Sequence, residues 1–77
     1  MTVNAVKVQT SVNDRIRREY GIEAPAGFAD AIASILSETA AANPAHPIAD
    51  YIESNLDVKP NRRTAIHVAS QIVHDTK

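Results

Sequence analysis

Large apolar side chains are scarce in this sequence, and their scarcity limits the core that the chain can build. Apolar residues make up 44% of the chain, but 13 of them are alanine, leucine occurs twice and tryptophan is absent. A domain of this size buries only about 60% of the surface that its unfolded chain exposes. No cysteine is present to add a disulfide. We therefore expect a helical domain that associates with itself or with a partner.

The charges of the chain nearly cancel. Eight Lys and Arg residues stand against nine Asp and Glu residues, for a net charge of −1, so the chain as a whole has no strong field for nucleic acid or anionic lipid. No apolar run approaches the ~18–20 residues that cross a bilayer, and residues 1–7 do not resemble a secretory signal. We therefore expect a cytoplasmic protein that does not contact membranes.

The first 21 residues are predicted to form an arm followed by a short helix. Residues 1–10 fit either a short edge strand or a disordered arm, and we prefer the arm because chain termini are often disordered. Ser11 is a typical N-cap residue, and Gly21 is typical of the residue just after a helix. The apolar residues between them recur every four positions, at Val12, Ile16 and Tyr20. They predict a helix of about two turns.

Residues 26–43 carry the longest helical pattern in the chain. Pro25 requires an extended residue before it and suits the start of a helix. The stripe that follows at helical spacing consists of Phe28, Ile32, Ile35, Leu36 and Thr39. Such a stripe predicts one continuous helix. Alanines flank it, and their small side chains would let a neighbouring backbone approach closely.

Two further helices are predicted after this one. The turn of residues 44–47 is short and begins and ends with proline, so the next helix should run antiparallel to the helix of residues 26–43. The apolar stripe of that next helix consists of Ile48, Tyr51, Ile52 and Leu56. After a break, Asn61 can cap a last helix of residues 62–74. The apolar face of the last helix consists of Ala65, Ile66, Ala69, Ile72 and Val73.

The sequence offers little for catalysis or for metal binding. It has no cysteine nucleophile, no G-x-S-x-G motif and no glycine-rich phosphate loop. His67 and His74 are seven residues apart, which is roughly 10 Å of helical rise and too far for one ion, and His46 is predicted in a turn. We therefore predict that the protein is not an enzyme and has no catalytic residue, no cofactor and no metal site.

Nucleic-acid binding is an alternative function that the basic residues suggest. The two basic clusters are Arg15, Arg17 and Arg18, and Lys59, Arg62 and Arg63. Two helices joined by a tight turn are also compatible with a helix-turn-helix fold. However, the second of those helices carries acidic residues that would face phosphates, and its turn holds two prolines in place of the usual glycine. A helix-turn-helix protein is therefore the second candidate function, after a helical domain that associates with itself or with a partner. A structural subunit of a large complex is the third.

One stretch of the sequence follows the motif of a known family. An extended apolar entry leads into Pro25, Gly27 and a large apolar residue, the spacing from Gly27 to Pro44 matches, and Glu38 falls where the family often has glutamate. With these features, residues 22–56 resemble the RIIa dimerization/docking domain of type II regulatory subunits of cyclic-AMP-dependent kinase, which also occurs in ropporin-like and radial-spoke proteins. The turn, Pro-x-x-Pro followed by an aliphatic residue, is closer to the related dumpy-thirty motif.

The resemblance implies an all-α fold in which a helical hairpin forms an X-type antiparallel four-helix bundle as a dimer. It divides the chain into an N-terminal arm and short helix (1–21), a dimerization and docking hairpin (22–57) and a C-terminal helix (58–77). The implied dimer core consists of Phe28, Ile35, Ile48, Tyr51, Ile52 and Leu56. The residues implied to dock a partner helix are Ile22, Ala24, Ala29, Ile32, Ala33 and Leu36.

The function implied by the resemblance is that of a non-catalytic module. Such a module forms a homodimer or heterodimer and binds an amphipathic helix of an anchoring or scaffold protein. In the family it works in kinase-anchoring scaffolds and in the axonemes of cilia and flagella, so the axoneme is an expected location. The alternative for the same apolar stripes is that they form the core of a monomeric bundle.

Overall fold

The protein is all-helical over the residues that can be described. The computed structural model describes residues 5–38 and 43–76, and this part contains four helices and no strand. The helices are α1 (Ala5–Tyr20), α2 (Phe28–Glu38), α3 (Ala45–Asn55) and α4 (Arg62–Asp75). The predicted all-α class is confirmed. Thr39, which was assigned to the stripe of the first long helix, lies outside the described residues.

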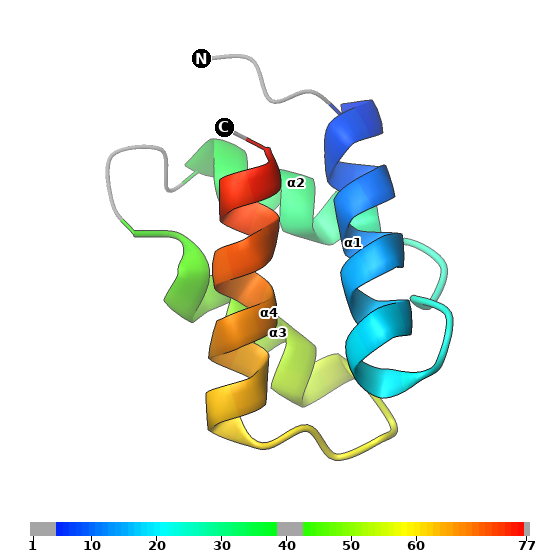
Figure 1. Ribbon diagram of the computed structural model, residues 1–77. Helices are drawn as coiled ribbons and strands as arrows, with labels where there is room; N and C mark the ends of the chain where they lie inside the picture. Colours follow the sequence, from blue (N-terminus) through cyan, green and yellow to red (C-terminus); the bar gives the residue numbers. More distant parts are fainter. Residues whose placement is uncertain (1–4, 39–42, 77) are drawn as a thin grey trace.

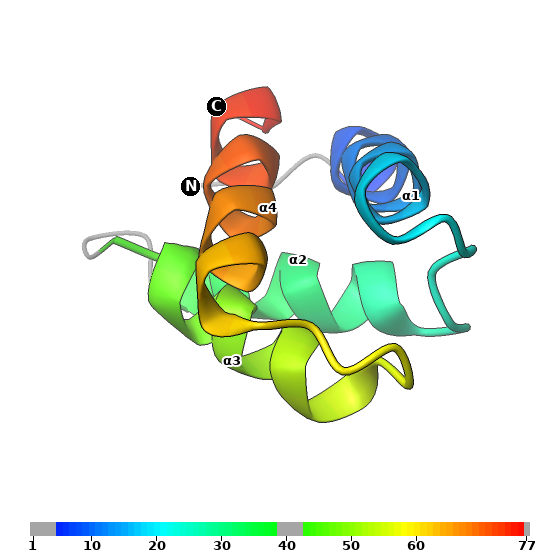
Figure 2. The ribbon, with the colours of Figure 1, turned by 60° about the horizontal axis from the view of Figure 1, so that its bottom comes forward.

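The four helices are arranged in two layers. In Figure 1, α1 and α4 lie beside each other and run in opposite directions, with α2 and α3 behind them. Figure 2 shows α1 and α4 on one side of the molecule and α2 and α3 on the other. The most extensive helix contact joins α3 to α4, and α1 packs on both α2 and α4. The contact between α2 and α3 is smaller. The two helices of the predicted hairpin are therefore held in place mainly by their contacts with α1 and α4.

Apolar residues from all four helices, together with Leu56 just after α3, form one core. The buried apolar residues are Val8, Val12, Ile16, Phe28, Ile32, Ala45, Ile48, Ala49, Ile52, Leu56, Ala65, Val68, Ala69 and Ile72. The two helices with the most extensive mutual contact each bury a pair of alanines four residues apart. Small side chains on one face allow two helix axes to approach closely. The buried alanines of α3 and α4 therefore leave room for these two helices to pack closely.

The prediction for the N-terminal residues was wrong, because α1 begins at Ala5. Val8 is fully buried and extends the stripe of Val12 and Ile16 by one turn toward the N-terminus. Ser11, predicted as an N-cap, lies inside α1, and its side chain is turned into the structure. A short helix gains most of its stability from tertiary packing, and here α2 and α4 supply that packing.

Apart from the end of α2, the predicted helix ends are mostly correct. α2 ends at Glu38, and Asn43, the predicted last residue of this helix, is not helical. Gly21 follows α1 with a positive φ of 70°, and its N–H donates to the carbonyl oxygen of Arg17 at 2.9 Å, as expected for a residue that ends a helix. The side chain of Asn61 accepts a hydrogen bond from the N–H of Thr64 at 2.8 Å and caps α4. α4 ends at Asp75, one residue later than predicted.

Two helix starts differ from the prediction. α2 begins two residues late, at Phe28, because residues 25–27 form a turn in which the N–H of Phe28 donates to the carbonyl oxygen of Pro25 at 3.1 Å. α3 begins two residues before Pro47, at Ala45, whose N–H donates to the side-chain oxygen of Asn43 at 3.1 Å. Within the described ranges, no helix has the length and apolar character needed to cross a bilayer.

Candidate interaction surface

The residues implied for the dimer core lie inside the single chain. Phe28, Ile48, Ile52 and Leu56 are buried, and Ile35 and Tyr51 are partly buried against the same core. The rings of Phe28 and Tyr51 meet edge to face with their centroids 4.8 Å apart. The apolar faces of α1 and α4 complete this core within one chain. A dimer through the same residues stays a prediction, and it would require α1 and α4 to move away.

The residues implied for docking divide into two groups. Ile32 has no exposed surface and belongs to the core, so a partner helix cannot reach it while the chain keeps this fold. The other five residues are partly exposed and pack against the edge of the core. They are Ile22, Ala24, Ala29, Ala33 and Leu36. This edge is therefore the part of the predicted docking surface that is accessible in the single chain.

Helix α2 combines high apolar content with little burial. Seven of its 11 residues are apolar, but only Phe28 and Ile32 are buried. Ala29, Ala33 and Leu36 are partly exposed, and their spacing of four and then three residues places them along one side of α2. We call these three residues the α2 stripe. It borders the core and provides a narrow apolar strip with two small side chains.

The two helix layers carry opposite charge. Helices α1 and α4 together hold six Lys and Arg residues against three Asp and Glu residues. Helices α2 and α3 hold four Asp and Glu residues and no Lys or Arg. Along the sequence, no Lys or Arg occurs between Arg18 and Lys59. The net charge of the whole chain hides this separation, whereas the net charge of each segment of the sequence would have revealed it.

Arg62 connects the two layers. From the first turn of α4 its guanidinium donates to the carboxylates of Asp50 and Glu53 on α3, the latter at 3.0 Å. One of its nitrogens also lies 3.4 Å from Nδ1 of His46. These hydrogen bonds to Asp50 and Glu53 raise the pKa of Arg62 above its usual range. One positive charge thus offsets part of the acidic charge of α3, while Asp30 and Glu38 on α2 form no ion pair with another described residue.

The basic clusters considered for nucleic-acid binding are partly occupied by internal ion pairs. Arg15 binds both carboxylate oxygens of Asp75, at 2.9 and 3.0 Å. Arg18 pairs with Asp14 at 3.0 Å. With Arg62 also paired to α3, each cluster has lost positive charge that phosphate contacts would need. Helix α3, the second helix of the helix-turn-helix alternative, turns four residues into the core and exposes Asp50.

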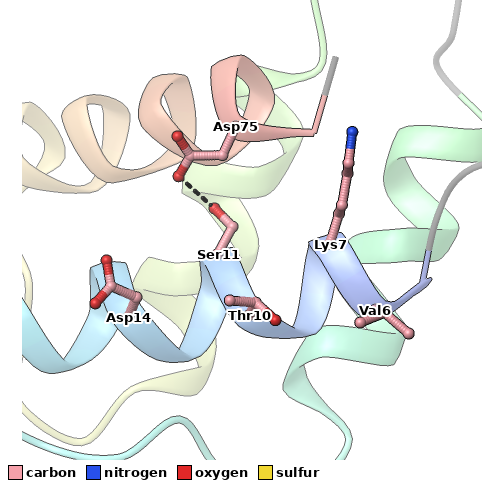
Figure 3. A pocket seen from close by; sticks show the side chains of 6 residues that line it. All are labelled: Val6, Lys7, Thr10, Ser11, Asp14 and Asp75. Carbon is pink, nitrogen blue, oxygen red and sulfur yellow. Dashed lines mark hydrogen bonds between the residues drawn. The ribbon is translucent and has the colours of Figure 1, made fainter.

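A cavity of about 380 Å³ opens between α1 and the end of α4 (Figure 3). It is lined by Val6, Lys7, Thr10, Ser11, Asp14 and Asp75. Inside it the hydroxyl of Ser11 donates to a carboxylate oxygen of Asp75 at 2.8 Å. Hydrogen bonds from Arg15 and Ser11 lower the pKa of Asp75, and a carboxylate with a lowered pKa is a weak base. The contact therefore links α1 to α4 and does not activate Ser11 as a nucleophile.

This link predicts a pH dependence of stability. Because the folded-state pKa of Asp75 is lowered, its contribution is fully present above the unfolded pKa of ~3.9 and is lost as the pH falls through the folded value. The Asp75→Asn variant should be less stable than the wild type at neutral pH, by about 1 kcal/mol or less because both side chains of the pair are 28% exposed. In strong acid the difference should vanish.

Urea unfolding of both proteins across this pH range measures the effect. Asp14→Asn is the matched control, since Asp14 contacts Arg18 on the same helix and joins no second element. A difference between wild type and Asp75→Asn that stays constant down to the lowest pH would contradict the assignment.

The three histidines do not come together. Histidines 46, 67 and 74 are all exposed, and across the described ranges no group of three or more His, Cys, Asp or Glu side chains is arranged to hold a metal ion.

Comparisons with protein-family models, with curated proteins and with solved structures find no match to this chain.

Proposed function

We propose that this protein is a non-catalytic interaction module that binds an amphipathic helix of a partner protein along α2. One observation carries the proposal: α2 is apolar at seven of its 11 positions and buries only Phe28 and Ile32. The other helices bury a larger part of their apolar residues in the core. An apolar helix side at the edge of a closed core is the kind of surface that helix-in-groove recognition uses.

The fold supports such binding without rearrangement. Phe28 and Ile32 anchor α2 in the core, so the α2 stripe is held on a rigid element. Its two alanines would allow a partner backbone to approach closely, and Leu36 would insert between side chains of the partner helix. A surface that is already formed loses little conformational entropy on binding. A scaffold or axonemal assembly, as the resemblance implies, is the setting that we propose for the module.

Site-specific photo-crosslinking in the cells that produce the protein tests the proposal. Ser37 is exposed and lies beside the α2 stripe, and Ser70 is an exposed serine on α4 in the other layer. A benzophenone amino acid at position 37 should give a discrete protein adduct, and the same amino acid at position 70 should not. Ala33→Glu should remove the adduct, because it places a charge in the stripe that a partner helix would have to desolvate.

Circular dichroism should show that Ala33→Glu keeps the helical fold, since Ala33 is partly exposed. Equal adducts from both positions, or an adduct that persists in the folded Ala33→Glu variant, would refute binding at α2.

A further inference from the structure

The connector between α1 and α2 contains backbone groups that the fold leaves unpaired. This connector, residues 21–27, passes beside α1 on its way to α2 (Figure 1). Its backbone hydrogen bonds lie near its two ends, where the N–H of Gly21 donates to α1 and the carbonyl oxygen of Pro25 accepts from α2. Between them, residues 22–24 form no hydrogen bond with another described residue. Their backbone donors and acceptors are therefore available to a second chain.

The exposure of successive residues indicates that this stretch is extended. Ile22 and Ala24 are partly buried against the core. The residues before, between and after them, Gly21, Glu23 and Pro25, are exposed. Alternation with a period of two is the pattern of an extended backbone, and a proline keeps the residue before it out of the helical conformation. Residues 22–24, which we call the pairing segment, therefore resemble a short edge strand.

A cavity of about 300 Å³ opens between the pairing segment and α1. It is lined by Asn13 and Arg17 of α1 and by Glu23 and Ala24 of the pairing segment. The side chains of Asn13, Arg17 and Glu23 are exposed, and none of them forms a hydrogen bond or ion pair with another described residue. An amide, a cation and an anion with unused hydrogen-bonding capacity therefore line one cavity beside unpaired backbone.

The size of this cavity favours a single extended chain over a helix. A helix with its side chains is about 10–12 Å wide, whereas a strand lies only about 4.8 Å from the strand with which it pairs. A volume of about 300 Å³ is at the lower end of the range for ligand sites. Three residues of a strand span about 10 Å, which matches the length of the pairing segment.

A second copy of this chain is a poor occupant of the same site. Antiparallel pairing of two such segments about their central residue would place two Glu23 side chains directly opposite each other, where like charges are destabilising. Pro25 has no N–H and ends the pairing after Ala24. A charged residue and a proline are features by which proteins keep a strand edge from pairing with an identical edge.

We infer that the pairing segment binds an extended peptide segment of another protein. The bound peptide adds a strand to this edge, and it carries an acidic side chain that contacts Arg17 and a basic side chain that contacts Glu23. Backbone hydrogen bonds supply the affinity, and the two charges fix the position of the peptide along the cavity. This site is separate from the α2 stripe and does not depend on helix binding there.

Nuclear magnetic resonance of the isotope-labelled full chain tests the inference. The probe is a short capped peptide of threonine and valine that carries one glutamate and one lysine. The amides of residues 22–24 should exchange rapidly with solvent in the free chain and at least about tenfold more slowly at saturating peptide. The same peptide with N-methyl groups along its pairing edge cannot donate these hydrogen bonds and should bind about tenfold more weakly.

Matched charge variants test the wall that α1 contributes. Arg17→Gln should weaken binding of the peptide about threefold, because it removes one exposed charge contact. Arg18→Gln removes the same charge from the next position and should leave binding unchanged, since Arg18 pairs with Asp14 and does not line the cavity. Circular dichroism should show that both variants keep the helical fold.

Several results would overturn the inference. Unchanged amide exchange at residues 22–24 at the highest peptide concentration, or equal binding of the N-methylated peptide, would contradict backbone pairing. An equal loss of binding in both arginine variants would contradict the contact with Arg17. Slower exchange that develops with increasing protein concentration, without any peptide, would identify a second copy as the occupant in place of another protein.

Discussion

Residues 22–57, expressed without α1 and α4, are expected to lose their helical circular dichroism and to behave as an unfolded chain. In the full protein, the core residues of α2 and α3 are completed by the apolar faces of α1 and α4. Without these helices, two segments of 11 residues each remain, and isolated helices below ~12–15 residues are marginal in water. The full chain, measured under the same conditions, is the control.

The opposite result would have a clear meaning. If the fragment is helical and sediments as a dimer, then the hairpin is an independent unit and the X-type bundle implied by the RIIa resemblance is its native assembly. In that case α1 and α4 occupy in the single chain the place that a second hairpin can take. Analytical ultracentrifugation of the fragment therefore decides between one core built by four helices of one chain and one core shared by two chains.

Ile32→Ala is expected to remove most of the stability of the full chain. Ile32 is fully buried in the core, and truncation of a buried isoleucine to alanine costs about 2–5 kcal/mol. A single core of this size rarely supplies more than ~3–5 kcal/mol, so the variant should be largely unfolded at room temperature. Urea unfolding followed by circular dichroism measures the loss.

Leu36→Ala is the matched control on the same helix. Leu36 belongs to the α2 stripe and is partly exposed, so its truncation should destabilise the chain by about 1 kcal/mol and leave the fold intact. The resemblance to the RIIa domain implied that Ile32 and Leu36 both dock a partner, whereas the structure buries Ile32 and leaves Leu36 partly exposed. A larger loss for Leu36→Ala than for Ile32→Ala would contradict this separation.

The same distinction determines how partner binding should be tested. A charged residue at Ile32 would abolish binding simply by unfolding the chain, because the cost of an unpaired charge in the core exceeds the stability of a domain this small. Ala33 and Leu36 lie at the edge of the core, where a substitution can change a contact without removing the fold. Variants of the α2 stripe are therefore the informative ones.

The candidate surface was only partly predictable. The segment 22–36 was identified from its apolar residues and its resemblance, and five of its six proposed docking residues are accessible. The ion pairs Arg15–Asp75 and Arg62–Glu53 were not predicted, because their partners are 60 and nine residues apart in the chain. To predict the charge separation between the two layers, one would have to count the charged residues segment by segment and also know which helices share a layer.

The sequence by itself determined that this chain is helical and where several helices end. Gly21 and Asn61 act through their own backbone and side-chain geometry, so their effect is local and can be recognised without a fold. Only the tertiary structure decided which apolar stripes meet. A stripe at helical spacing specifies a surface that must be covered but not what covers it, and here α1 and α4 cover the core faces of α2 and α3. The alanine-bearing helices α3 and α4 make the most extensive helix contact, and α2 keeps an apolar edge that the described part of the chain leaves partly exposed.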